Sequence, residues 1–394
     1  MNTNTTPRDM RLDAVRGLFL VIMAGVHIPS PVSHWLNEPF GFTSAAEGFI
    51  FLSACLAGLV YGKVHNKGGW PEMSRRVWNR AKLVYIVHLA VLLPVALIAW
   101  ADARQIIPLA NHFHDFLVHP LGSLLLMPLL LHQPPLFDIL PLYVVLLLAT
   151  PLVFTAARRQ GWKTVLAISF SGWLAAQLQA SCFPLNAPSL LPVRWGSFNL
   201  LAWQFLWIAG LALGESSLHG RMIPQKGRAV WGGLAAVIVL TGFCGRHEII
   251  PGLWNNPGLD CWMDKWTLGP LRLLNFSAWV VLLLAWNPRP PDWLLAPTAL
   301  WGRHSLAVFA LHLPLVVTAT AVIQMFALTD AEQTVIVLLV VASIWVWVSW
   351  LENNAQQRKR IADFPVTAIA STPWRKRLQY QEIVPAVPLN PSAG

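Results

Sequence analysis

The sequence predicts an all-α protein, a polytopic membrane helical bundle of about ten transmembrane helices with both termini in the cytoplasm. Three observations support this fold class. Of the 394 residues, 55% are hydrophobic and only 12% are charged, a composition outside the range of soluble globular domains. Long apolar runs recur along the chain, and Lys and Arg residues are concentrated in alternate loops between them.

The apolar runs give the expected helices in order. A helix needs about 20 residues to cross the hydrocarbon core of a bilayer. The expected spans cover residues 14–30, 44–62, 81–101, 139–157, 163–180, 198–214, 229–245, 270–287, 300–326 and 332–351. The apolar run at 121–131 is too short to cross as a helix, so we expect a short re-entrant or interfacial helix there.

The loop charges set the expected orientation. One side of the membrane receives most of the Lys and Arg residues, whereas the other side holds only Arg104, Arg194, Arg246, Lys265 and Arg272. Because loops rich in Lys and Arg stay in the cytoplasm, we expect a multi-pass protein of the bacterial inner membrane. The net charge of +10 therefore reflects orientation in a lipid bilayer, and no nucleic acid is expected as a partner.

Two regions of different character are expected along the chain. Residues 1–352 form one integral membrane domain, because no internal repeat or second globular domain is evident. Residues 353–394 are rich in Pro, Asn, Gln and basic residues. We expect them to form a disordered cytoplasmic tail that lies against anionic lipid.

The first apolar run carries the ionisable residues Asp13, Arg16 and His27. The eleven-residue step from Arg16 to His27 closes to within about 20°, which places both on one face of a helix. Ionisable groups within a membrane are costly and are typical of functional sites. His27 is expected to act as a general base toward a hydroxyl that attacks an acyl carbonyl. The alternative is a buried histidine bonded to a backbone carbonyl, and Arg16 on the same face favours the functional interpretation.

Glu47 at the start of the second run needs a partner if it is buried. It either holds His27 in one tautomer or pairs with an arginine for structure, and the sequence favours neither role. In the same run Ala54, Gly58 and Gly62 recur every four residues. This stripe of small residues predicts close packing against another helix.

A basic cluster of Arg75, Arg76, Arg80 and Lys82 precedes the third apolar run. Arg76 and Arg80 share a face at i, i+4 and suit the phosphates of a nucleotide-bearing acyl donor such as coenzyme A. Ordinary anchoring on the cytoplasmic side is the alternative.

The ninth apolar run contributes Ser305 and His312, which are seven residues apart on one face. They either line the cavity that contains His27 or form an interhelical hydrogen bond. A separate group of His112, His114, Asp115 and His119 matches no established zinc spacing. No metal site is expected, and these residues are interpreted as a solvated loop.

Several segments resemble the membrane-bound acyltransferase-3 superfamily, and more closely its OpgC-type branch, which is linked to succinylation of osmoregulated periplasmic glucans. The resemblance is carried by RLDAVRGLFLVIMAGVH, SAAEGFIFLSACLAG and WGRHSLAVFALH, and by FDILPLYVVLLLATP, FNLLAWQFLWIAG and DKWTLGPLRLLNF. Together these segments touch most of residues 8–315. Their shared order is more specific than any single motif.

This resemblance implies a membrane O-acyltransferase with a catalytic histidine that matches His27 and a basic residue that matches Arg16. It also implies a cytoplasmic acyl-CoA donor, basic residues near Arg76 and Arg80, and a glucan acceptor in the periplasm. Acyl-CoA is a substrate here, and no tightly bound cofactor is expected. The sequence departs from the family pattern in two ways: Ala54 replaces a frequent Gly, and Arg76 and Arg80 are spaced more widely than the usual basic pair.

The acyl group is expected to be succinyl from the resemblance alone, because no residue distinguishes succinyl from acetyl. A membrane transporter or flippase for a glycan or small anionic substrate is the alternative function. In that case the intramembrane arginine and histidine would line a substrate or proton path. Such proteins often show inverted repeats and paired broken helices, and neither is evident in the sequence.

Overall fold

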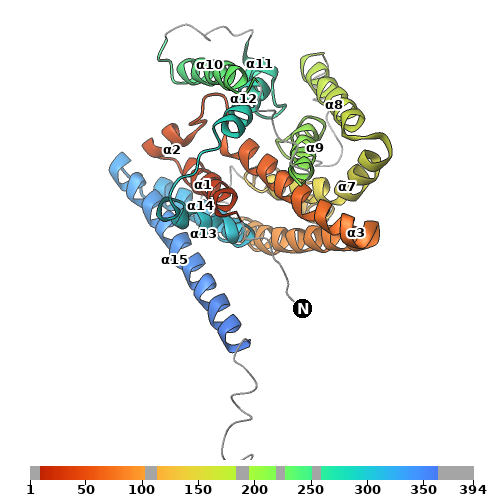
Figure 1. Ribbon diagram of the computed structural model, residues 1–394. Coiled ribbons are helices and arrows are strands. Elements are labelled where there is room, and N and C mark those ends of the chain that lie inside the picture. Colours follow the sequence, from red (N-terminus) through yellow and green to blue (C-terminus); the bar gives the residue numbers. More distant parts are fainter. Residues whose placement is uncertain (1–8, 103–112, 183–194, 219–226, 251–258, 363–394) are drawn as a thin grey trace, which may run out of the picture. The chain divides into compact units, whose positions relative to one another are not determined.

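The computed structural model describes residues 9–102, 113–182, 195–218, 227–250 and 259–362. These ranges are helical and contain no β-strand (Figure 1). The helices are α1 (Met10–Val26), α2 (Pro31–Leu36), α3 (Ala45–Asp102), α5 (His114–Val118), α6 (Pro120–Leu126), α7 (Ile139–Gln160), α8 (Trp162–Cys182), α9 (Leu200–Ser217), α10 (Arg228–Arg246), α11 (Asp260–Met263), α12 (Pro270–Trp286), α13 (Asp292–Arg303), α14 (Ser305–Met325) and α15 (Asp330–Ala362). The chain divides into two compact units, Met1–Val348 and Ser349–Gly394.

The all-α fold predicted from the sequence is confirmed, and each expected span falls on a helix. Among the described residues, five helices are long and apolar enough to cross a membrane, namely α3, α7, α10, α14 and α15. Helix α12 is apolar but shorter. The expected total of about ten spans and the position of the termini stay predictions.

Helix α3 consists of two helical segments that meet at Gly69. Gly69 has a φ of 67° and a ψ of −169°, which are not helical values. Glycine adopts a positive φ without the clash that a β-carbon would cause. A straight helix of 58 residues would be about 87 Å long, nearly three times the thickness of a hydrocarbon core. The bend therefore gives two helices in place of one, and they cover the expected spans 44–62 and 81–101.

The span expected at 300–326 is α14, but it begins at Ser305 because the chain leaves the helical path at His304. Helix α13 ends at Arg303 and α14 begins at Ser305, while His304 has a φ of −103° and a ψ of 27°. The sequence around this point contains no Pro and reads as one continuous helix. The break accompanies close packing of α13 along α1, which α14 does not follow.

Glycines bring the backbones of α1 and α13 into direct contact. A β-carbon at Gly17 of α1 would overlap the carbonyl oxygen of Thr298, and one at Gly302 of α13 would overlap the carbonyl oxygen of Asp13. Small residues allow helices to approach this closely, and packing of this kind drives helix association in lipid. The contact fixes the end of α13, and with it the start of α14, beside the first turns of α1.

The small-residue stripe predicted in α3 packs against α9, which confirms the prediction of close packing. A β-carbon at Gly58 would overlap the carbonyl oxygen of Leu211, and one at Gly62 would lie 3.2 Å from the side chain of Glu215. Helix α9 has its own glycine on this face, because a β-carbon at Gly210 would lie 2.6 Å from the β-carbon of Ala54. The first segment of α3 is thereby held against the centre of the bundle.

Large aromatic side chains fill the core and find partners for their polar atoms. Trp207 is buried in α9 and donates its indole N–H to the hydroxyl of Thr150 over 3.1 Å. Trp203, one turn earlier, donates to the carbonyl oxygen of Trp266 over 3.1 Å. A buried indole is stable when its single donor is satisfied in this way.

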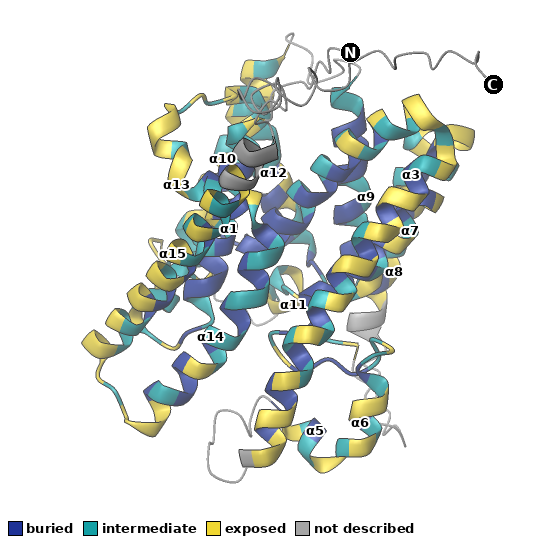
Figure 2. Ribbon diagram, turned by 90° about the horizontal axis from the view of Figure 1, so that it is seen from below, coloured by how far each residue is buried: buried dark blue, intermediate teal, exposed yellow. Residues whose placement is uncertain are grey.

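The outer faces of several helices are apolar as well. In α10 five large apolar side chains on one side of the helix are between 52% and 65% exposed: Val230, Trp231, Leu234, Val237 and Leu240. In α15, Val337, Val340 and Ile344 are buried, whereas the neighbouring Leu338 and Leu339 are exposed. Figure 2 shows exposed and less exposed residues along α15. An exposed apolar stripe of this size is unfavourable in water and is typical of a lipid-facing helix. The protein is therefore a membrane protein.

Two expected boundaries change in the structure. Helix α15 continues to Ala362, so residues 353–362 are helical rather than part of a disordered tail. The local sequence contains Ala, Gln, Arg and Lys, which favour a helix even where no apolar face is present. Residues 363–394 lie outside the described part of the chain. The short helix expected at 121–131 is α6, which ends at Leu126.

Candidate functional site

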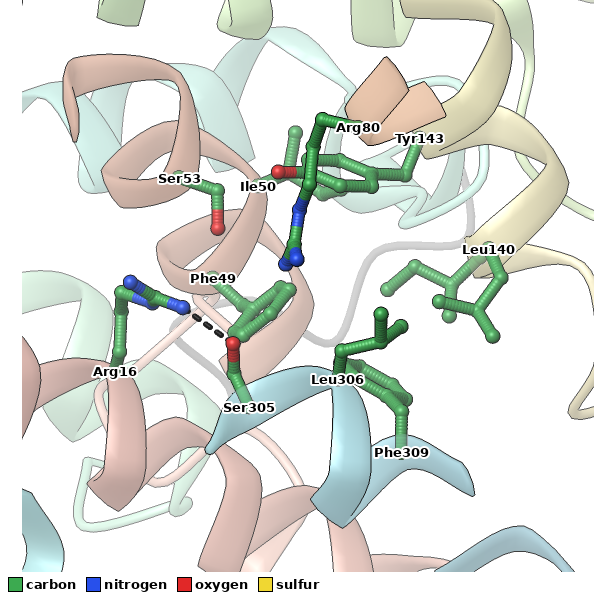
Figure 3. A pocket seen from close by; sticks show the side chains of 11 residues that line it. Arg16, Phe49, Ile50, Ser53, Arg80, Leu140, Tyr143, Ser305, Leu306 and Phe309 are labelled. Carbon is green, nitrogen blue, oxygen red and sulfur yellow. Dashed lines mark hydrogen bonds between the residues drawn. The ribbon is translucent and has the colours of Figure 1, made fainter. Parts of the chain in front are cut away.

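A small pocket, which we call the arginine pocket, lies where α1, α3, α7 and α14 meet. It has a volume of about 20 Å³, enough for roughly one water molecule. Its lining residues are Arg16, Phe49, Ile50, Ser53, Arg80, Ile139, Leu140, Tyr143, Ser305, Leu306 and Phe309. Figure 3 shows two arginines from different helices, Arg16 and Arg80, that point toward the same space.

Arg16 and Ser305 form a direct contact in this pocket. The guanidinium of Arg16 donates a hydrogen bond to the hydroxyl of Ser305 (Figure 3). It also lies 3.9 Å from the carboxylate of Asp13, one turn earlier on α1. The glycine contacts between α1 and α13 bring these groups together, because they place the start of α14 beside this turn of α1. One end of the guanidinium is thereby held while the rest borders the pocket.

The two arginines expected to act together in the second segment of α3 have different surroundings. Arg80 is half-buried and lines the pocket, whereas the side chain of Arg76 is 57% exposed and pairs with Glu72 over 2.6 Å. Glu72 lies four residues before Arg76 on the same helix and also pairs with Arg75 over 2.7 Å. The structure brings Arg80 to Arg16 and leaves Arg76 at the surface.

A larger cavity, which we call the histidine cavity, adjoins the arginine pocket. Its volume is about 580 Å³. The polar and aromatic residues among its lining are His27, Ser33, His34, Asn37, Glu38, Ser44, Asp138, Ser197, Phe198, Lys265, Trp266, Phe309 and His312. The wall combines polar and apolar side chains, and the volume lies in the range of small-molecule sites.

His27 and His312 face each other across part of this cavity. His27 follows the last residue of α1 and is half-buried, and His312 is buried in α14. Their ring centroids are 6.2 Å apart and the ring planes differ by 20°. The position of His27 at a helix end, where the chain turns toward α2, exposes its ring to the cavity. The expectation that these two histidines share a cavity is confirmed by this geometry.

The backbone fixes the tautomer of His312. Its Nδ1 lies 3.3 Å from the carbonyl oxygen of Val308. A carbonyl oxygen only accepts, so this bond requires a proton on Nδ1 and leaves a lone pair on Nε2 of the neutral ring. Among the described residues no side chain or backbone group bonds this Nε2. His312 therefore offers a proton acceptor to whatever occupies the cavity.

The arginine pocket and the histidine cavity share two lining residues, Ile139 and Phe309. Ile139 is the first residue of α7, and Phe309 lies between Ser305 and His312 on α14. The ring of Phe309 contacts His312 edge-on, with centroids 5.2 Å apart. One apolar wall thus separates a pocket with two guanidiniums from a cavity with two imidazoles.

Comparison with models of protein families gives a match for this chain. It matches the model of the OpgC protein family over residues 8–356.

It belongs to the OpgC family. The matched residues include both cavities and extend into α15, so the resemblance seen in the sequence is confirmed. No curated protein and no solved structure matches the chain.

In this OpgC-family chain, Glu47 lies in an ion-pair network rather than beside His27. Its buried carboxylate accepts hydrogen bonds from Ser44 and from the guanidinium of Arg272. Arg272 also binds Glu38, which pairs in turn with Arg246 over 2.6 Å. Of the two roles that the sequence left open, the geometry favours the pairing with an arginine.

Ser305 is also placed differently from one expectation. It lines the arginine pocket with Arg16, while His312 lines the cavity with His27. The two residues lie on one face of α14, as their spacing requires, but they serve two neighbouring spaces. The hydrogen bond of Ser305 is interhelical, which was the second alternative.

Sequence reasoning missed three charged residues of the histidine cavity, Glu38, Asp138 and Lys265. Asp138 directly precedes α7, and its carboxylate accepts a hydrogen bond from the backbone N–H of Ser197 over 2.8 Å. Burial raises the pKa of Asp138 above its ordinary value. One signal existed for Lys265, because it is one of the few cations on the side of the membrane that is poor in Lys and Arg.

The histidines of the 112–119 segment form no metal site in the described structure. His114 is largely exposed and bonds Asp115 over 3.4 Å. The described residues contain no group of three His, Cys, Asp or Glu side chains that could hold a metal ion. His112 lies outside the described residues.

Proposed function

We propose that this OpgC-family protein is a multi-pass enzyme of the bacterial inner membrane that transfers an acyl group from cytoplasmic acyl-CoA to a hydroxyl of a periplasmic glucan. The acyl group is succinyl, by similarity to the branch to which the chain belongs. The observation that carries the proposal is the shared wall of Ile139 and Phe309 between the arginine pocket and the histidine cavity. A donor that enters from the cytoplasm and reacts with an acceptor from the periplasm needs two such adjoining spaces.

The arginine pocket supports donor binding. Guanidinium groups bind phosphate oxygens through two parallel hydrogen bonds, and Arg16 and Arg80 approach the same space from different helices. The pocket is small because these side chains themselves occupy it. Binding of a phosphate therefore requires the long side chain of Arg80 to move aside, whereas Arg16 is held by Ser305.

The charge pattern of the chain gives the direction of transfer. The loops rich in Lys and Arg place the first turn of α1 and the Gly69 bend on the cytoplasmic side. Arg16 is then closer to the cytoplasm, and His27, eleven residues further along α1, is closer to the periplasm. The donor phosphates and the acceptor sugar would meet the protein from opposite sides.

The histidine pair supports the chemical step. The acceptor hydroxyl attacks the thioester carbon while His27 takes its proton, and the tetrahedral intermediate then loses the thiolate of coenzyme A. The carbon–sulfur bond breaks, a carbon–oxygen bond forms, and the imidazolium returns the proton to the departing sulfur. His312 lies next to His27 with a free lone pair on Nε2 and positions the acceptor hydroxyl or receives its proton.

Transfer of label from succinyl-CoA to glucan by the purified protein in detergent tests this proposal. We expect His27→Ala to lower kcat by at least 100-fold, the usual contribution of a general base. His114→Ala is the matched control, because that histidine is exposed and lies on neither cavity. Its activity should equal that of the wild type.

Two results would overturn the proposal. Transfer that continues unchanged in His27→Ala would remove this histidine from the chemistry. Absence of transfer by the wild type, together with movement of glucan or a small anion across proteoliposomes, would establish the transporter alternative.

A further inference from the structure

Lys265 occupies a fixed position on the wall of the histidine cavity. It lies in the segment between α11 and α12, and its ammonium lies 5.1 Å from the centroid of the Trp266 ring. Trp266 is held in turn, because its carbonyl oxygen accepts hydrogen bonds from the backbone N–H of Asn199 over 2.9 Å and from the indole of Trp203. A cation over an indole face is stabilised by the ring quadrupole. The ammonium is thus kept at the cavity.

The two carboxylates that line this cavity with Lys265 are both engaged by other groups. Glu38 is already bound by two guanidiniums, those of Arg272 and Arg246. Asp138 is buried, which raises its pKa, and its carboxylate accepts a hydrogen bond from the N–H of Ser197; the charge of Lys265 acts on Asp138 only as a smaller, opposing effect that lowers this pKa. In the part of the chain that the structure describes, no carboxylate forms an ion pair with Lys265.

A cation on the wall of the cavity that both histidines line selects for charge in the group that reacts there. We propose that Lys265 binds the free carboxylate of a dicarboxylyl acyl group while the thioester carbon of that group lies at His27 and His312. This inference rests on the proposed function and names the residue that would distinguish a succinyl from an acetyl donor. Lys265 is half-buried, and an acyl group without a carboxylate would cover its ammonium without pairing it, which costs free energy.

The test compares two donors with the full-length protein in detergent. Initial rates with succinyl-CoA and acetyl-CoA give a ratio of kcat/KM for the wild type and for Lys265→Gln and Lys265→Arg. Lys163→Gln is the matched control, because Lys163 is exposed at the start of α8 and lies on neither cavity. We expect Lys265→Gln to lower the succinyl-to-acetyl ratio by at least tenfold, Lys265→Arg to retain most of it, and Lys163→Gln to leave it unchanged.

The outcomes separate this inference from the proposed function. If the wild type transfers neither acyl group, the proposed function fails. If the wild type transfers succinyl and Lys265→Gln lowers kcat/KM equally for both donors, Lys265 has only a structural role and the inference is overturned. A change confined to the KM for glucan would also overturn it, because Lys265 would then bind the acceptor.

Discussion

Replacement of Glu47 by alanine tests whether this residue supports the fold or the chemistry. In the structure its carboxylate is fully buried and accepts hydrogen bonds from the N–H and hydroxyl of Ser44 and from Arg272. Arg272 is 1% exposed and would keep one carboxylate, that of Glu38, which it shares with Arg246, together with the carbonyl oxygen of Met263. The network then contains one carboxylate and two guanidiniums, in place of two of each. Loss of one partner from a buried pair costs about 3–5 kcal/mol.

Reversible unfolding in mixed detergent micelles measures this free energy, and succinyl transfer by the folded fraction measures the chemistry. We expect Glu47→Ala to lose stability while the protein that remains folded keeps most of its activity. The double variant Glu47→Leu with Arg272→Met should recover much of the stability, because both charges are removed and Glu38 retains Arg246. Glu72→Ala, at an exposed pair, is the control and should not change stability measurably. Normal stability with lost transfer in Glu47→Ala would refute the reasoning.

Three further predictions follow from the same contacts. Arg80→Ala should raise the KM for acyl-CoA about tenfold, which is the effect of one lost charge-assisted hydrogen bond. Arg76→Ala should leave this KM unchanged. Equal effects of the two substitutions would contradict the separation of the two arginines. Gly302→Leu should abolish the monodisperse folded protein seen by size-exclusion chromatography, because its side chain would overlap the α1 backbone, whereas Gly233→Leu, in open space, should be tolerated. Although burial opposes its charge, two guanidiniums hold the pKa of Glu38 below 4.5; its stabilisation is therefore complete above that value and is lost as pH falls through the lowered pKa. As the pH falls, the melting temperature of the wild type should therefore decrease more steeply than that of Glu38→Gln.

The parts of the site that could be predicted are those that depend on one helix. Arg16 and His27 lie on one face of α1 by periodicity alone, and the small stripe that includes Gly58 follows from the same geometry. Desolvation also makes intramembrane ionisable groups conspicuous, so the sequence itself indicates them. These inferences need no knowledge of which helices are neighbours.

The parts that could not be predicted depend on tertiary contacts. Arg76 and Arg80 share a helix face, and only the folded chain separates them, because Arg76 is exposed and pairs with Glu72 whereas Arg80 lines the arginine pocket. The break at His304 has no local signal, because it accompanies packing of Gly302 against α1. Lys265 belongs to an irregular segment without periodicity, so its position on the cavity that the two histidines line is visible only in the folded chain.

The spacing along α14 also restricts the kind of donor. Ser305, Phe309 and His312 lie on one face, in the order of the arginine pocket, the shared wall and the histidine cavity. Seven helical residues span about 10 Å, and the eleven residues from Arg16 to His27 span about 16 Å. A donor whose anionic group is bound by Arg16 must therefore carry its acyl carbon at the end of an extended, uncharged arm.

Coenzyme A thioesters have such an arm, whereas in an acyl phosphate the phosphate is attached directly to the acyl carbonyl. We therefore expect succinyl phosphate to give no protein-dependent transfer to glucan under conditions in which succinyl-CoA is used. The rate in the presence of His27→Ala supplies the background of uncatalysed acylation. Efficient use of the acyl phosphate would mean that anionic group and reacting carbon bind in one space, and the division of labour between the arginine pocket and the histidine cavity would be wrong.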